Sequence, residues 1–228
     1  MARMKAPREL GIAPMSTVDA PRTESPRSKR AVIIATAIDH FGEEGFEHTK
    51  WATIADDVGI GQTALYHYFE SKVHCLLTIM RLELSSSVER FRAATGAAPD
   101  PAAALVAAVA SAYEASPRDA LQRRILQNHM DLLATPRPSK KEEEERLMCR
   151  SLVQEIEQEW AALVERGIKD GVFRVTDPLL SARMLLALVV GVWRWYRPGG
   201  EMTLDQITTV MAEAAARLVD SKDVPVAS

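Results

Sequence analysis

The strongest constraint on the fold is a very short connection between two short helical segments in the first third of the chain. The first segment, with Thr49 as its expected N-cap, places apolar side chains at helical spacing on one face (Trp51, Ile54, Ala55 and Val58). Gly59 stands where a left-handed C-terminal cap is expected, and only Ile60 separates it from the second segment, Gly61 to Phe69. Two short helices joined by so tight a turn are typical of a helix-turn-helix.

The rest of the chain is also predicted to be helical, because apolar residues recur at helical spacing and no segment alternates with period two for long enough to make a strand. Besides the two short segments, glycine and proline breaks delimit expected helices from Ser25-Pro26 to about residue 41 and at about 71–95, 101–115, 117–134, 139–169, 178–197 and 203–219. The fold is therefore predicted to be all-α, with about nine helices and no internal repeat.

Composition divides the chain into four parts. Residues 1–24 mix Pro, Ser, Thr and Arg without any period and are expected to form a flexible basic arm. Residues 25–72 hold the predicted helix-turn-helix domain, residues 73–220 a second helical domain, and residues 221–228 a disordered tail. The whole chain has a net charge of −3, but residues 1–30 carry seven Lys and Arg against three acids. The basic side of the chain is therefore at its N-terminal end.

The second short segment has two different faces. Leu65 and Phe69 point inward at i, i+4, while Gln62, Thr63, Tyr66 and His67 fall on the opposite side. That outer face offers an amide for a base edge, a hydroxyl and two ring groups for phosphate oxygens, which suits a DNA major groove. On an isolated helix, a merely solvated face is the alternative interpretation.

These residues resemble the DNA-binding signature of the TetR family of bacterial regulators. The resemblance lies in Thr49, Ile54-Ala55, Val58-Gly59-Ile60 and Leu65-Tyr66-His67-Tyr68-Phe69 followed by Ser71-Lys72, and it extends from roughly Arg27 to Lys72. It implies an all-helical homodimer with an N-terminal three-helix DNA-binding domain and a C-terminal domain for ligand binding and dimerisation. The two recognition helices would enter successive major grooves of a pseudo-palindromic operator in double-stranded DNA.

The resemblance also implies roles for individual residues. Thr49, Lys50 and Lys72 would contact phosphates, Gly61, Gln62 and Thr63 would approach bases, and Tyr66 and His67 would contact phosphate or base edges. Gly61 stands where the family commonly has Ser, and Thr63 where it often has Gly, so base specificity is not transferable from a relative. Gln62 is the clearest candidate for a direct base contact. Arg22, Arg27, Lys29 and Arg30 could add phosphate contacts, with the arm either in a minor groove or free.

The last two predicted helices form the candidate dimer interface. The 178–197 helix is apolar nearly all round, which exceeds what one intrachain face needs, and the 203–219 helix adds a second apolar face. The pair resembles the C-terminal helices that form the dimer interface in TetR-type regulators. Burial within a single chain is the alternative.

A ligand pocket is expected between the helices of residues 101–169, and ordinary core packing is the alternative for each lining residue. The candidates share large apolar or aromatic side chains with few polar anchors: Tyr113, Ile125, His129, Met130, Leu133, Leu152, Ile156, Trp160 and, near a later helix end, Trp193. Such a lining favours a small hydrophobic effector. The resemblance implies a repressor that a lipid-like or acyl-CoA effector releases from its operator by moving the 71–95 helix.

Other classes of protein and site have little support. The five histidines show no HExxH or other metal-ligand spacing, and there is no GxSxG, P-loop or GxGxxG motif, so we expect no enzyme, no metal site and no cofactor. Cys75 and Cys149 are expected to be free thiols in the core, with a redox or metal role as the alternative. The acidic run Glu142–Glu145 is expected to oppose a helix dipole and otherwise to be solvated.

The sequence also gives an expectation for the cellular location and for the class of partner. No signal peptide is recognisable, and the longest apolar stretch, Met184–Trp193, is shorter than the roughly 20 residues that span a bilayer, so a cytoplasmic protein with no membrane partner is expected. The rival to a DNA-binding regulator is an all-helical adaptor that binds protein, without DNA-binding or catalytic activity. Such an adaptor would tolerate alanine at Gln62 and Tyr66.

Overall fold

A computed structural model describes residues 26–220 of the chain. The expected basic arm with Arg22, the Ser25 cap and the expected C-terminal tail lie outside the described residues.

The described part of the chain is all-α, as predicted. Nine α-helices and one short 3₁₀-helix follow one another: α1 (Pro26–Glu43), α2 (Trp51–Val58), α3 (Gln62–Tyr68), α4 (Lys72–Gly96), α5 (Pro101–Tyr113), α6 (Pro117–Asn128), η1 (Met130–Leu133), α7 (Lys140–Lys169), α8 (Pro178–Trp195) and α9 (Leu204–Leu218). The predicted number of helices is thereby confirmed.

One predicted helix is shorter than expected. The segment predicted as a single helix over residues 117–134 ends at Asn128 and continues as the 3₁₀-helix η1. At the junction the His129 N–H bonds the Leu126 carbonyl three residues back, while His129 Nδ1 lies 2.8 Å from the Ile125 carbonyl oxygen. The imidazole thus takes the acceptor that the next α-helical backbone bond would use, and the chain tightens there.

Among the α-helices α2 to α9, side-chain caps are present at six N-termini and absent at two. Hydroxyl or carboxylate oxygens accept backbone N–H bonds at the N-termini of α4 to α9: Ser71, Asp100, Ser116, Ser139, Asp177 and Thr203. α2 begins after Lys50 and α3 after Gly61, and neither has a side-chain cap. The prediction that Thr49 caps α2 is wrong. The Thr49 hydroxyl points back and donates to the Gly45 carbonyl at 2.9 Å.

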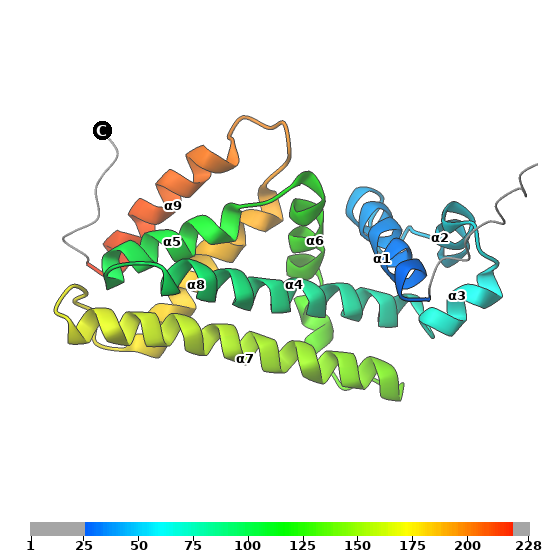
Figure 1. Ribbon diagram of the computed structural model, residues 1–228, viewed down its shortest axis with the longest axis horizontal. Coiled ribbons are helices and arrows are strands. Elements are labelled where there is room, and N and C mark those ends of the chain that lie inside the picture. Colours follow the sequence, from blue (N-terminus) through cyan, green and yellow to red (C-terminus); the bar gives the residue numbers. More distant parts are fainter. Residues whose placement is uncertain (1–25, 221–228) are drawn as a thin grey trace, which may run out of the picture.

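The helices form a head at one end of an elongated body (Figure 1). α1, α2 and α3 make the head. α4 leaves it and runs beside α7 along the length of the body, and paired contacts such as Thr78 with Glu145 and Arg92 with Glu159 show that the two helices are parallel. α5 packs on the far part of α4, α8 packs on α7, and α9 packs on α5 and α8. α6 crosses between this group and α1 (Figure 1).

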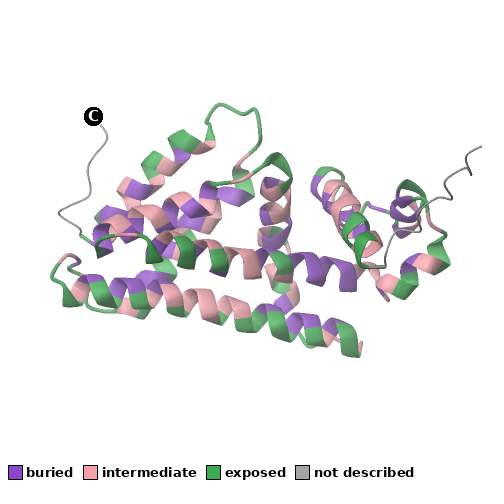
Figure 2. Cartoon of the chain, viewed as in Figure 1, coloured by how far each residue is buried: buried purple, intermediate pink, exposed green. Residues whose placement is uncertain are grey.

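The start of α4 is the most enclosed stretch of the molecule. Seven consecutive residues, from His74 to Met80, are buried, so neighbours cover this helix on every side (Figure 2). It belongs to a core shared by the head, the end of α6, η1 and the start of α7, whereas a second core fills the body around Trp160 and Leu185. Any displacement of this part of α4 must therefore move the head with it.

α8 combines a buried face with an exposed apolar one. Leu185, Val189 and Val192 are buried, whereas Leu180 and Met184 are about half exposed. By length and composition α8 is the one described helix that could cross a membrane, a test that core helices of globular proteins also pass.

Candidate nucleic-acid interface and internal cavity

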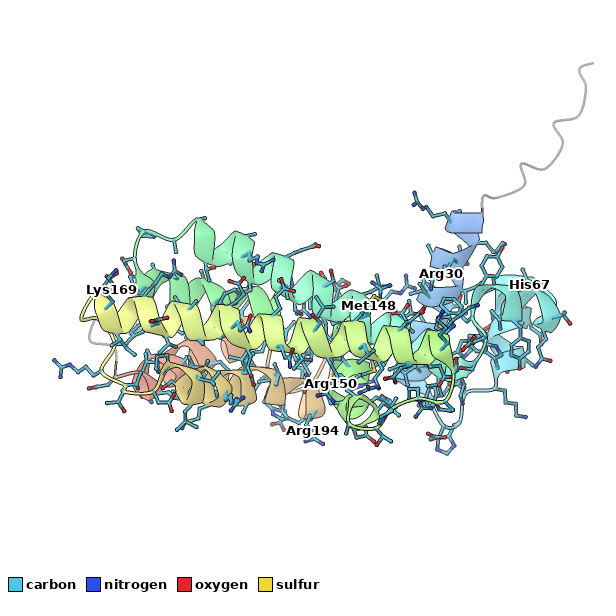
Figure 3. All side chains as sticks on the ribbon, turned by 90° about the horizontal axis from the view of Figure 1, so that it is seen from below. Arg30, His67, Met148, Arg150, Lys169 and Arg194 are labelled. Atoms are coloured by element: carbon cyan, nitrogen blue, oxygen red, sulfur yellow. The ribbon has the colours of Figure 1, made fainter. Side chains whose placement is uncertain are left out.

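α3 presents its polar face to the outside at the tip of the head. Leu65 and Phe69 are fully buried and fix the helix against the head core. Gln62, Thr63, Tyr66 and His67 are exposed, and His67 lies at the outer edge of the molecule (Figure 3). All four side chains that the sequence placed on one face are accessible together.

The N-termini of α2 and α3 lie beside one another at the same surface. A shallow concavity there is lined by Lys50 and Trp51 from the start of α2 and by Gln62 and Tyr66 from α3. Lys50 and Gly61 are exposed. Lys72 and the carboxylate of Glu70 line the same depression. Two cations, two uncapped helix N-termini and a hydroxyl thus converge there beside one acid, and the cations and amides are groups that bind phosphate oxygens.

Thr49 and Lys72, which were predicted to contact phosphates, form hydrogen bonds within the chain. Thr49 is only 2 % exposed, so its hydroxyl does not reach the surface that the resemblance implied. Lys72 Nζ donates to the carbonyl oxygens of Phe46 at 2.6 Å and Thr49 at 3.0 Å, and it lies 4.3 Å from the centre of the Phe46 ring. Lys72 therefore fastens the loop between α1 and α2 to the start of α4.

A histidine ties α1 to α2. His40 Nε2 lies 2.6 Å from an Asp57 carboxylate oxygen, and its Nδ1 lies 2.9 Å from Glu44. Burial lowers the pKa of His40, but the hydrogen bonds and charges of Asp57 and Glu44 outweigh burial, so the pKa is raised above its ordinary value of 6.5. The protonated imidazole stabilises the arrangement of the two helices.

Two sets of contacts join the head to the body. On one side of α6, Arg118 makes a paired hydrogen bond with Asp39 of α1, and Arg124 donates to the Gly42 carbonyl. At the parallel starts of α4 and α7, the Ser71 hydroxyl donates to Glu142 at 2.6 Å.

The acidic run at the start of α7 is therefore not simply solvated, which corrects the expectation from the sequence. Glu142 and Glu145 are buried, and Glu145 accepts hydrogen bonds from Thr78 and Arg81 of α4. Two of the four acids, Glu142 and Glu145, thus form contacts that hold α7 against α4.

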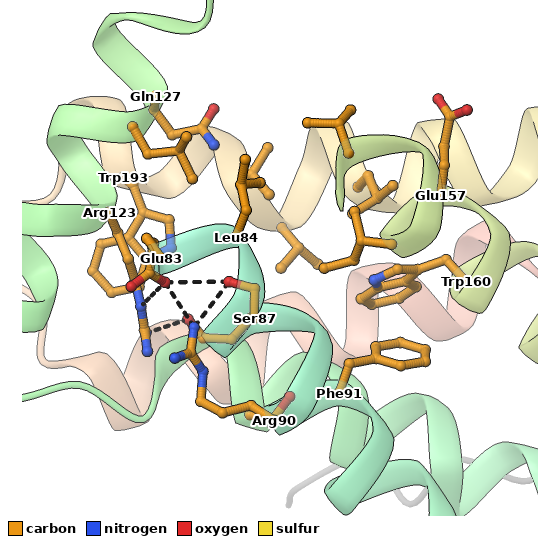
Figure 4. Close-up of a pocket in the computed structure, with 18 of the residues that line it drawn as sticks. Glu83, Leu84, Ser87, Arg90, Phe91, Arg123, Gln127, Glu157, Trp160 and Trp193 are labelled. Carbon is orange, nitrogen blue, oxygen red and sulfur yellow. Dashed lines mark hydrogen bonds and ion pairs between the residues drawn. The ribbon is translucent and has the colours of Figure 1, made fainter. Parts of the chain in front are cut away.

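A cavity of about 260 Å³ lies in the body between α4, α5, α6, η1, α7 and α8. Of the nine residues predicted to line a ligand pocket, four lie around it: Met130, Ile156, Trp160 and Trp193. Phe91 of α4 packs on Trp160, with ring centres 5.1 Å apart. This end of the cavity is apolar and aromatic (Figure 4).

The other five predicted pocket residues lie in the packing around the cavity. The Tyr113 hydroxyl donates to the Val189 carbonyl at 2.8 Å, and burial raises the pKa of this phenol. His129 packs on Phe46 in a different concavity, near the head. Ile125, Leu133 and Leu152 belong to the core that α4 shares with the head. For these five residues the structure supports the core-packing alternative.

The sequence interpretation missed a charged cluster at the other end of the cavity. Glu83 Oε1 accepts from Arg90 Nη2 at 2.7 Å and from Arg123 Nε at 3.1 Å, and Ser87 joins the same cluster (Figure 4). Burial lowers the pKa of Arg123, which Glu83 opposes. Glu83, Ser87 and Arg90 share one face of α4, but spacing alone does not show that this face meets α6 across a cavity.

Neither cysteine lies at a reactive site. Cys75 and Cys149 are free and buried, and burial raises the pKa of Cys149 to about 12 and that of Cys75 as well. Both thiols are therefore protonated at neutral pH. Among the described residues, no group of three His, Cys, Asp or Glu side chains could hold a metal ion.

Comparison with known proteins identifies both parts of the chain. Residues 33–79 match the family model for bacterial regulatory proteins of the tetR family, and residues 98–219 match the model for the tetracyclin repressor-like C-terminal domain. The chain is 30 % identical over 194 residues to the HTH-type transcriptional repressor KstR2 of Rhodococcus jostii, which covers 85 % of this chain and 92 % of that protein.

Solved structures agree with this assignment. The ketosteroid transcriptional regulator KstR2 of Mycobacterium tuberculosis superposes with a TM-score of 0.69 and 26 % identity, over 87 % of this chain and 98 % of the other. AibR, solved in complex with isovaleryl coenzyme A and operator DNA, has the same fold, with a TM-score of 0.70 and 21 % identity over 85 % and 99 % of the two chains. The chain belongs to the TetR family of DNA-binding transcriptional regulators, which are not enzymes.

Proposed function

We propose that this protein is a cytoplasmic, homodimeric repressor that binds a pseudo-palindromic operator and leaves it when a small hydrophobic effector enters the body. The observation that carries the proposal is the polar outer face of α3, with Gln62, Thr63, Tyr66 and His67 accessible together at the tip of the head. An adaptor that binds protein would need no such face, and the family assignment favours DNA.

The contacts with DNA would divide into two classes. Gln62 and Thr63, at the start of α3, would enter the major groove and approach bases, as an amide that pairs with adenine does. Lys50, Gly61, Tyr66 and His67 surround that point and would hold phosphates. Thr49 and Lys72 would support the loop behind them, given their contacts within the chain.

The dimer would form through α8 and α9. Leu180, Met184 and Trp195 are each about half exposed and lie along one side of α8, and Val210 of α9 is exposed to the same degree. A row of large apolar side chains of this extent is unusual on a monomer. Symmetric pairing of two copies would cover it and would present two heads to two half-sites.

The effector would occupy the cavity of the body. The lining is largely apolar, and relatives of this chain include a ketosteroid regulator and a protein solved with isovaleryl coenzyme A, which supports a lipid-like or acyl-CoA effector. α6 links the cavity to the head beside α4, since Arg123 and Gln127 line the cavity while Arg118 and Arg124 hold α1. Release requires that the effector bind the DNA-incompetent arrangement more tightly.

A mobility-shift titration tests the DNA-binding part of the proposal. DNA upstream of the gene, or a site selected from a random pool, is titrated with protein at several salt concentrations. The wild type should give a shift that survives scrambled competitor, and Gln62→Ala should weaken it by about 1–3 kcal/mol on the preferred sequence. Because Gln62 is exposed, the melting temperature should not change.

A pair of lysines supplies the matched comparison. Lys50 lies at the candidate interface, whereas Lys169 is equally exposed at the opposite end of the body (Figure 3). Lys50→Ala should lower the dependence of log K on log salt by about 0.9 per protomer, about 1.8 for the dimer, and Lys169→Ala should leave it unchanged. Equal effects of the two lysine variants would show that Lys50 makes no phosphate contact, and an unchanged affinity of Gln62→Ala, or no specific shift with either DNA, would contradict α3 as the DNA-binding helix.

A further inference from the structure

The charged cluster at one end of the cavity is built from three elements. Glu83, Ser87 and Arg90 come from successive turns of α4, Arg123 comes from α6, and the end of α5 contributes carbonyl oxygens. Glu83 is 3 % exposed and Arg123 4 % exposed. Burying ionised groups is costly unless they are paired, so their position beside a cavity requires an explanation.

Arg123 and Arg90 differ in how many of their guanidinium nitrogens have a hydrogen-bond acceptor. Arg123 uses all three of its nitrogens on acceptors of the chain: Glu83 from Nε, the Ala112 carbonyl from Nη1 and the Glu114 carbonyl from Nη2, the last two at 2.7 Å. It also lies over the Trp193 ring, 5.0 Å from its centre. Arg123 is therefore a positioning residue that fixes Glu83 and the end of α5.

Arg90 has one nitrogen without a hydrogen-bond acceptor. Its Nη2 donates to Glu83 and Ser87 and its Nη1 to Ser86, but its buried Nε has no hydrogen-bond partner among the described residues. A guanidinium N–H that is buried without an acceptor costs free energy that a ligand oxygen would recover.

The charge balance points in the same direction. Two guanidinium groups share one directly bonded carboxylate, that of Glu83. The next nearest acid, Asp119, attracts both arginines electrostatically, but its hydrogen bonds go to the backbone N–H and hydroxyl of Ser116, the N-cap of α6. At the far end of the cavity, Glu157 is paired with Arg183. Of the two guanidinium groups, only that of Arg90 has a buried nitrogen, Nε, without an acceptor among the described residues.

We propose that the cavity binds a small apolar molecule that carries a carbonyl or carboxylate oxygen at one end, and that Arg90 donates to this oxygen while the body of the molecule packs against the Phe91 and Trp160 rings. Gln127, one helical turn beyond Arg123 on α6, lines the same cavity and supplies a second donor. The inference rests on the cavity being the effector site of the proposed function.

The size of the cavity limits the ligand further. About 260 Å³ lies just below the roughly 300–1,000 Å³ of pockets that enclose drug-sized ligands. A whole coenzyme A thioester is much larger than this space, so only its acyl part and thioester carbonyl would lie inside. A free acid and a thioester share the same recognised chemistry, an oxygen acceptor on a short apolar body.

Binding measurements without DNA test the inference. Octanoate, octanoyl-CoA and butylbenzene are titrated into the full-length protein, and the fluorescence of Trp160 and Trp193, which line the cavity, reports binding alongside calorimetry. In the wild type, at least one of the two oxygen-bearing probes should bind. Which of them binds more tightly distinguishes a free acid from a thioester as the source of the oxygen.

Substitutions at two arginines of α4 locate the interaction. Arg90→Gln should lower the affinity for the oxygen-bearing probe by about ten- to one-hundred-fold. It should leave the affinity for butylbenzene, which has no oxygen, unchanged. Arg90→Lys keeps the charge but loses the paired donors of the guanidinium group, so its affinity for the oxygen-bearing probe should lie between those of the wild type and Arg90→Gln. Arg92→Gln is the matched control, since Arg92 pairs with Glu155 and Glu159 on the surface outside the cavity.

Two results would overturn the inference. One is equal affinity of wild type and folded Arg90→Gln and Arg90→Lys variants for octanoate and octanoyl-CoA, and the other is no binding of either probe at millimolar concentration by folded wild-type protein. Release of the operator DNA is measured in a separate experiment. A probe that binds through Arg90 without releasing DNA would contradict the proposed function and leave the ligand chemistry intact.

Discussion

At the scale of single residues, the head combines side chains that face outward with side chains that hold its own loops. The outward set on α3 was predictable, because residues at i, i+3 and i+4 of a short helix must lie on one side. The roles of Thr49 and Lys72 were not, since Gly45 and Phe46, whose carbonyl oxygens they bond, lie in a loop whose path no helical period determines.

Lys72 provides a test of this distinction. Lys72→Met keeps most of the apolar stem but removes the donors to Phe46 and Thr49, so we expect the free energy of unfolding to fall by about 1.5–3 kcal/mol in urea denaturation. The salt dependence of DNA binding should stay as in the wild type. An unchanged stability together with a salt slope lowered by about 0.9 per protomer would instead support the phosphate contact.

His40 should make the stability of the head depend on pH. Because its pKa in the folded protein is raised above 6.5, its contribution is fully present below that value and is lost as pH rises through the folded pKa. The melting temperature of the wild type should therefore exceed that of His40→Gln most clearly near pH 5.5, and by less near pH 8.5. His74, whose pKa burial lowers, is present in both proteins and cancels in the difference. A difference that grows with pH would contradict the assignment.

At the scale of elements, the helices were predicted well and their ends less well. Long amphipathic segments such as α4 and α7 carry a strong period and clear caps. The end of α6 was placed too late because the imidazole of His129 competes for a backbone carbonyl, which is a local event without a periodic signal.

The close approach of α6 to α1 depends on a glycine. A Cβ at Gly42 would lie 2.9 Å from the Cβ and a Cδ of Leu121, so Gly42→Ala must push the two helices apart. We expect the free energy of unfolding to fall by about 1–3 kcal/mol, and we expect effector to change the operator Kd by less than in the wild type. Gly96→Ala, where nothing lies within 4 Å of the added Cβ, is the matched control and should show neither effect. If effector changes the operator Kd of a folded Gly42→Ala protein as much as it does in the wild type, α6 does not connect the cavity to the head.

At the scale of the whole molecule, the two-part organisation was predictable and the cavity was not. Residues on α4, α6, α7 and α8 line it together, and only tertiary packing brings them to one place. The sequence interpretation searched residues 101–169 and so omitted α4, which supplies the charged end through Glu83, Ser87 and Arg90.

The dimer proposal belongs to this scale as well. Leu180→Glu would place a charge at the N-terminal end of the exposed apolar face of α8, where the wild-type side chain is 55 % exposed. Light scattering after gel filtration should show a monomer, and operator affinity should fall because one head meets only one half-site. Leu147→Glu, at an equally exposed leucine on α7, should remain dimeric. A dimeric Leu180→Glu protein would place the interface elsewhere.

Of the helices α2 to α9, only α2 and α3 begin without a side-chain cap, and in the proposed complex these two N-termini would face the DNA. Because no side chain accepts from their first amides, these turns should fray and exchange their hydrogens with solvent faster than the capped turns in the free protein. Phosphate oxygens of the operator can serve as the missing acceptors. Deuterium uptake at residues 51–54 and 62–65 should therefore fall on DNA binding, while the first turn of α8, capped by Asp177, should be unaffected. In that sense the operator completes the folding of the domain that recognises it.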